Sequence, residues 1–136
     1  MQTRELQESW LIWLDASEQL TRCLHELTVA ITLRDAERIN RLRPEADQLR
    51  RRLVHLDEDI VVATSQIARE LKVDSCVSRI AANLEKTEGQ AVQALSNRKI
   101  VAERTIQYLL DKNNELFRCR FAVVHAEQSV ARAKAA

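Results

Sequence analysis

The chain has 136 residues, of which one is glycine and one is proline, and 4% are aromatic. This composition argues strongly against an all-β fold, which needs turn residues and β-branched or aromatic strands at short intervals. With 21 basic and 20 acidic side chains the net charge is +1, so the chain lacks the large positive field that gathers nucleic acid or an anionic membrane. Length and helix-forming composition predict a single all-α domain over residues 1–136.

The first predicted helix covers residues 4–33. Apolar residues recur there at steps of three and four, with Ser17 the one polar member of the seam, which is the pattern of an amphipathic helix. The turn from Trp10 to Leu14 is apolar on all sides. We expect this turn either at the crowded end of a bundle or in an exposed contact with a partner.

A second helix is predicted over residues 36–72, after a tight turn at Arg34 and with Asp35 as its N-cap. Its apolar seam keeps one register through Pro44. Either a kinked helix or a short helix abutting a long one would hold the seam in phase at that proline. The seam consists of Ile39, Leu42, Ala46, Leu49, Leu53, Leu56, Ile60, Ala63 and Ile67.

Two further helices are predicted in the second half of the chain. The periodicity lapses near residue 73, where Asp74 or Ser75 can cap a short connecting helix that carries Val77, Ile80 and Leu84. The last helix is predicted over residues 88–132, with a capping-box pattern at Thr87 and Gln90, and with Gly89 where a helix could end or begin. Three long helices and one short connecting helix predict an elongated antiparallel bundle.

The sequence contains no pattern for catalytic or metal chemistry. His25, His55 and His125 lie on different helical stretches, without another ligand at the spacing of a metal site. A chain with one glycine cannot form the usual glycine-rich phosphate loop. We therefore expect neither enzymatic activity nor a cofactor. The basic cluster Arg50–Arg52 has acidic neighbours, which favours a solvated helix face over an anion site.

The cysteines and the N-terminus predict a cytoplasmic protein. Cys23, Cys76 and Cys119 are odd in number and widely spaced, which is typical of reduced thiols. The N-terminus lacks the pattern of a signal peptide, and the longest apolar run, residues 10–14, is far shorter than the roughly 20 residues that span a bilayer.

The last helix carries the candidate partner-binding surface. Its apolar residues cover close to half of the circumference, and Lys99, Asn113 and Arg120 fall inside that arc. Arg120 could extend its charged head to water from a covered stem. Alternatively, the bundle could leave a groove rimmed by polar groups for a partner's amphipathic helix. The candidate residues are Ile106, Leu109, Leu110, Asn113, Leu116, Phe117, Arg120, Phe121 and Val124.

The order of these segments resembles that of the FlgN family of flagellar export chaperones. The resemblance rests on the leucine-bearing first and second helices, the short turn at residues 34–37, the lapse after Leu71, and residues 113–117, Asn-Asn-Glu-Leu-Phe, which are similar to the family's Asn-x-x-Leu-Ile. Three positions depart from the family. Arg34 stands where glycine is usual, Pro44 interrupts the second helix, and Leu110 sits where the family often repeats an asparagine.

The resemblance implies a cytoplasmic type III export chaperone. Its last helix would bind the amphipathic terminal segment of hook-associated (hook–filament junction) subunits and prevent their premature assembly. Its C-terminus, with Arg132 and Lys134, would contact export-gate or export-ATPase components.

Two other classes of function are weighed against this one. The alternative is a coiled-coil adaptor or structural subunit that forms homo-oligomers through its wide apolar stripes. Nucleic-acid binding through Arg50–Arg52 is weakened by the neighbouring acids, and we expect neither nucleic-acid binding nor membrane insertion.

Overall fold

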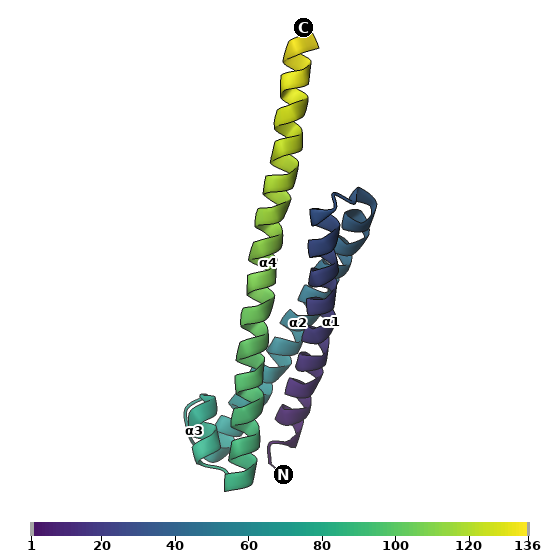
Figure 1. The fold of residues 1–136 in the computed structure, drawn as a ribbon. Helices are drawn as coiled ribbons and strands as arrows, with labels where there is room; N and C mark the ends of the chain where they lie inside the picture. The colour runs from purple at the N-terminus through teal and green to yellow at the C-terminus, as the bar shows by residue number, and fades with distance from the viewer. Residues whose placement is uncertain (1, 136) are drawn as a thin grey trace.

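The computed structural model describes the backbone of residues 2–135 and, except for residues 122–131 and 135, their side chains. This range contains four helices and no strand: α1 (Arg4–Thr32), α2 (Ala36–Leu71), α3 (Val77–Ala82) and α4 (Lys86–Ala135). The expected all-α fold is confirmed, as is the order of two long helices, a short one and a long one. α1 and α4 run in the same direction and α2 runs against both (Figure 1).

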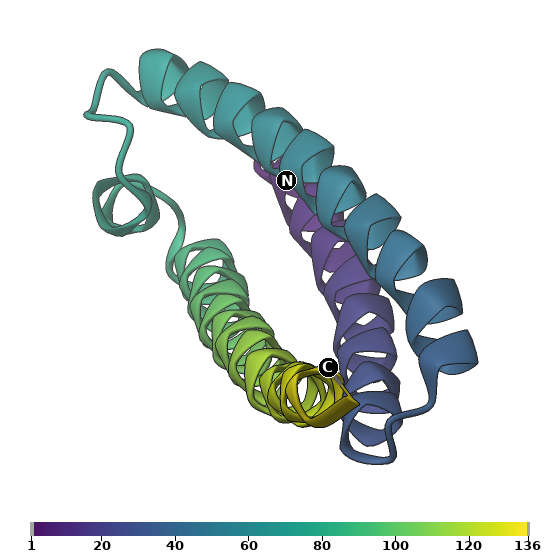
Figure 2. The ribbon, with the colours of Figure 1, turned by 90° about the horizontal axis from the view of Figure 1, so that it is seen from above.

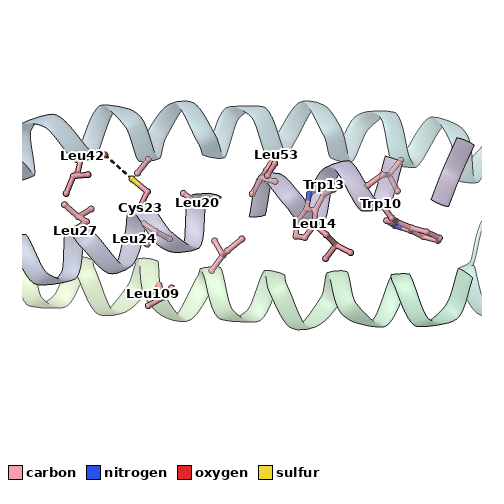
Figure 3. Packing of buried hydrophobic residues seen from close by; sticks show 14 of the residues in the cluster. Trp10, Trp13, Leu14, Leu20, Cys23, Leu24, Leu27, Leu42, Leu53 and Leu109 are labelled. Carbon is pink, nitrogen blue, oxygen red and sulfur yellow. Dashed lines mark hydrogen bonds between the residues drawn. The ribbon is translucent and has the colours of Figure 1, made fainter. Parts of the chain in front are cut away.

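α1 lies between the other two long helices. Trp10, Trp13, Leu20 and Leu24 of α1 are each at most 2% exposed, and Figure 3 shows them between the ribbons of α2 and α4. In the described chain no Cα atom of α2 comes within 8 Å of a Cα atom of α4. Figure 2 shows α2 and α4 diverging, with α3 on the side where they separate. The core is therefore built around α1.

The predicted seam of α1 is buried along its whole length. Ser17 fits into this seam because its hydroxyl donates a hydrogen bond to the carbonyl of Leu14, 2.7 Å away. The apolar turn is divided between core and surface. Trp10, Trp13 and Leu14 are buried, whereas Leu11 is 50% exposed and Ile12 is 49% exposed.

The turn from α1 to α2 ends one helix and begins the next within three residues. Arg34 adopts the left-handed conformation with φ of 54°, and the backbone N–H groups of Arg34 and Asp35 donate to the carbonyls of Ile31 and Ala30, which is a Schellman C-cap. Glycine favours this conformation. The side chain of Asp35 then accepts the N–H of Arg38 at 3.2 Å, which confirms the predicted N-cap.

α2 is one continuous helix through Pro44. Ile39, Leu42 and Ala46 on either side of the proline are all buried, so the seam stays in one register, as predicted. The alternative of a short helix abutting a long one is wrong.

The start of α3 differs from the prediction. Its N-cap is Cys76 rather than Asp74 or Ser75, and the helix stops at Ala82, before Leu84.

α4 begins earlier than predicted. It starts at Lys86, because the Glu85 carboxylate accepts the backbone N–H groups of Thr87 and Glu88 at 3.1 and 3.2 Å. Glu85 thus caps the helix in place of the predicted capping box, and Gly89 lies inside α4.

α4 extends well past the rest of the molecule. α1 and α4 run side by side, and residues at the same level differ by 85 in number, as in the hydrogen-bonded pairs Thr3–Glu88 and Thr28–Asn113. The last residue of α1, Thr32, therefore lies level with Phe117. The 18 residues from 118 to 135 continue the helix for about 27 Å, beyond α1 and α2 (Figure 1). Among the described residues, no helix has an apolar stretch long enough to cross a bilayer.

Candidate partner-binding surface on the last helix

Three of the predicted partner-binding residues belong to the core. Ile106, Leu109 and Asn113 are 8%, 3% and 4% exposed, because this side of α4 packs against α1. Their side chains hold α4 to the bundle, so they are not available to a partner in this structure. This corrects the predicted surface at these three positions.

Asn113 is buried at little cost because its side chain is fully engaged. Its Nδ2 donates to the carbonyl of Leu24 at 3.0 Å, and its Oδ1 accepts from the Thr28 hydroxyl at 2.5 Å. A buried amide with both ends bonded avoids the desolvation penalty of an unsatisfied polar group. The residue that was expected to rim a groove instead fixes the level of α4 on α1.

The outer part of the predicted surface remains partly exposed. Leu110, Leu116, Phe117 and Phe121 are half-buried against the edge of the core. The rings of Phe117 and Phe121 stack with centroids 4.3 Å apart and planes 28° apart. These four side chains form an apolar strip, called here the distal strip, which runs from the edge of the bundle onto the projecting part of α4.

Basic side chains lie beside the distal strip. The Arg43 guanidinium carbon of α2 lies 4.4 Å from the centroid of the Phe117 ring, a cation–π geometry. Arg120 is half-buried, which is compatible with a covered stem that extends its head to water. Val124 lies outside the described side chains.

Lys99, the third polar residue in the arc, links all three long helices. Its ammonium lies 2.7 Å from Asp57 Oδ1 of α2, pairs with Glu103 of α4, and lies 4.7 Å from the Trp13 ring of α1. Burial disfavours the charged form of Lys99, but the hydrogen bonds to Asp57 and Glu103 outweigh it and raise the pKa. The sequence placed Lys99 on the apolar arc but did not indicate Asp57 or Trp13 as its partners.

The other candidates from the sequence stay separate. Arg50–Arg52 are all exposed on α2. The three cysteines are free thiols, with Cys23 buried and the other two exposed. Within the described part of the chain, no three His, Cys, Asp or Glu side chains gather closely enough to hold a metal ion, and the His125 side chain lies outside that part.

Comparison of the chain with protein-family models, with curated proteins and with solved structures finds no match.

Proposed function

We propose that the protein is a helical chaperone of the FlgN type, which binds the amphipathic terminal segment of hook-associated flagellar subunits before export. The observation that carries the proposal is the distal strip. Leu110, Leu116 and Phe117 lie half-buried beside the core, and Phe121 lies on the part of α4 that continues past the end of α1. A half-covered apolar strip with aromatic anchors is the kind of surface on which a partner's amphipathic helix docks.

The binding surface in this proposal is smaller than the one predicted from the sequence. It keeps Leu110, Leu116, Phe117 and Phe121, with Arg120 at its border. It omits the three residues that pack against α1, and it omits Val124, which lies outside the described side chains. A client segment that is disordered when free would fold on this strip, so the cost of ordering it would offset part of the contact energy. Such a complex can be released at the export machinery.

The test is titration calorimetry of the full chain with a synthetic peptide of the amphipathic terminal segment of a hook-associated subunit from the same genome. Phe117→Glu should weaken binding by about 2 kcal/mol or more, with little loss of helicity. Tyr108→Glu is the matched control, since Tyr108 lies on the same helix and is 63% exposed. It should leave the affinity unchanged.

A second variant separates the binding surface from the core. Leu53 of α2 is 7% exposed, so Leu53→Ala should lower the unfolding free energy by about 2 to 5 kcal/mol without removing the binding surface. Unchanged peptide affinity for Phe117→Glu, or equal losses of thermal stability for the Phe117 and Leu53 variants, would contradict the proposal.

A further inference from the structure

The three long helices occupy three corners of a four-helix arrangement. In a four-helix bundle each helix contacts two neighbours, and the diagonal pair stays apart. Here α1 contacts both α2 and α4, while α2 and α4 stay more than 8 Å apart at every Cα pair described. The fourth corner, opposite α1, therefore lies between α2 and α4. The chain fills one end of this corner itself, because α3 lies there (Figure 2).

Above α3 the fourth corner is a cleft with a mixed lining. Close to Phe117, the floor of the cleft is formed by α1 and its walls by Arg43, Asp47 and Arg50 of α2 and by Leu110, Asp111 and Asn114 of α4. Farther down, the bridge between Lys99 and Asp57 crosses the cleft. Val61 lies one helical turn after Asp57 and is 62% exposed, and Ile100 is 44% exposed. The cleft between α2 and α4 is therefore lined by charged and apolar side chains near Phe117 and is bordered by the Lys99–Asp57 bridge farther down.

The projecting part of α4 is as long as the part of α4 that lies between the Lys99 bridge and Phe117. Residues 118–135 form 18 residues of helix, as many as the residues from 99 to 116, which form one wall between the Lys99 bridge and Phe117. Projection and wall are adjacent parts of one helix. We place a two-fold axis near Phe117, perpendicular to α4. Residues 118–135 of each copy then lie beside residues 99–116 of the other copy, so both copies use the same surface, as in an isologous dimer.

The charge at the far end of the projection is complementary to that of the cluster around Lys99. Residues 118–135 carry four basic groups and one acidic group. The cluster of Asp57, Lys99 and Glu103 holds two carboxylates and one ammonium, and so keeps one negative charge. With the axis near Phe117, Arg132 and Lys134 of one copy fall level with residues 102 and 100 of the other, beside this cluster.

We propose that two copies of this chain associate through antiparallel α4 helices, so that residues 118–135 of each copy occupy the open fourth corner of the other. Each bundle then gains its fourth helix from its partner. The stacked rings of Phe117 and Phe121 lie next to the two-fold axis. This inference goes beyond the proposed function, since a client segment would have to displace the second copy from the distal strip.

The first test is the molar mass of the full chain in the absence of any client, measured by size-exclusion chromatography with light scattering over a range of concentrations. We expect a mass twice the chain mass of 15.6 kDa. The double variant Arg132→Glu/Lys134→Glu should weaken the dimer by about tenfold, because it sets acids against acids in a partly shielded cleft. Arg98→Glu/Lys112→Glu makes the same charge change on the same helix outside the cleft, and should leave the dimer intact.

The second test reports which surface is used. Asn114 lines the cleft and lies three residues from the proposed axis. Two copies of Asn114→Cys, in a Cys76→Ser/Cys119→Ser background that removes the two exposed thiols, would lie about 9 Å apart along the helix. A bis-maleimide that spans this rise together with the roughly 8–10 Å between packed helix axes should link them into a covalent dimer. Lys112→Cys in the same background should not be linked, since residue 112 is exposed and does not line the cleft.

A chain that stays monomeric at every concentration would overturn the proposal and leave the cleft to a client segment. A dimer that is not cross-linked through Asn114→Cys would assign the interface to another face. The same conclusion would follow if Arg132→Glu/Lys134→Glu weakened the dimer no more than Arg98→Glu/Lys112→Glu does. Client capture is measured separately on the Arg132→Glu/Lys134→Glu variant. Loss of the dimer with client binding retained therefore bears on this inference and not on the proposed function.

Discussion

The hydroxyl of Thr28 lies 2.5 Å from the side-chain oxygen of Asn113, across 85 residues of sequence. Because the Asn113 amide also bonds the backbone of Leu24, this pair sets the level of α4 along α1. A single polar residue at a core position of packed helices is a known way to specify register at some cost in stability.

Asn113→Ala should lower the unfolding free energy by about 1 to 2 kcal/mol, since it removes two hydrogen bonds and leaves Thr28 with a lost partner. A double-mutant cycle with Thr28→Ala, measured by urea denaturation, should give a coupling energy of about 0.5 kcal/mol or more. Strictly additive effects would mean that the two side chains do not interact in solution.

Lys99→Met should lower the stability by about 1 to 2 kcal/mol, because it removes the contact with the Trp13 ring and leaves Asp57 and Glu103 without their shared cation. The raised pKa of Lys99 sets the sign of the pH dependence. The contribution is present below the ordinary value of 10.5 and is lost as the pH rises through the higher folded-state value. Thermal melts should thus differ between the native chain and the variant at pH 7 and converge at strongly alkaline pH; a gap that widens there would contradict the assignment.

Gly89→Ala should destabilise the chain although alanine is the better helix former. An added Cβ at residue 89 would lie 2.4 Å from the carbonyl oxygen of Ala81, so α3 would have to move away from α4. The gain in helix propensity is about 1 kcal/mol, and we expect the clash to exceed it, with a net loss of about 1 to 3 kcal/mol. Gln90→Ala, at the exposed neighbouring position, is the control. A more stable Gly89 variant would show that α3 does not pack this closely.

The three thiols should differ in reactivity toward maleimide. Burial, followed by the nearby carboxylates of Glu45 and Glu26, raises the pKa of Cys23 to about 11, so this thiol stays protonated and covered at neutral pH. Backbone N–H groups of Arg79 and Ser78 lower the pKa of the exposed Cys76, which increases its thiolate fraction. Peptide mass spectrometry should find Cys76 modified first and Cys23 modified after unfolding. Labelling of Cys23 in the native chain at the rate of Cys119 would contradict the packing of α1 against α2.

The sequence allowed α1 and α2 to be predicted closely because their burial follows the period of the helix. Ile39, Ala46 and Leu53 recur every seven residues and are all buried, and no tertiary information is needed to see this repeat. The same reasoning failed at the start of α4. There the cap is a glutamate, Glu85, whose role depends on a side-chain rotamer and not on residue type alone.

The candidate surface could be predicted in part, for a related reason. A polar residue inside an apolar arc indicates either an exposed groove or an internal bond, and the choice depends on the residue across the interface. For Asn113 that residue is Thr28, and for Lys99 it is Asp57. Thr28 lies on α1 and Asp57 lies on α2. Which residue of these helices lies opposite a given residue of α4 depends on how far the helices are shifted along one another, and the apolar periodicity of the sequence does not give that shift. Phe117 and Phe121 could be identified from the sequence because they are apolar residues on the arc of the last helix, and this identification requires no knowledge of a partner on another helix.

The central position of α1 has a consequence for the order in which the molecule opens. Since α2 and α4 each pack on α1 and not on each other's backbone, α4 can separate while α1 and α2 remain a joined hairpin. In native-state hydrogen exchange we therefore expect amide protons of α4 to exchange through a partial unfolding of lower free energy than that of α1 and α2. The Thr3 hydroxyl donates a hydrogen bond of 2.6 Å to the Glu88 carboxylate. This bond joins the first turns of α1 and α4, and we expect it to break last when α4 separates. The α1–α2 hairpin would thus survive as the last cooperative unit of the fold.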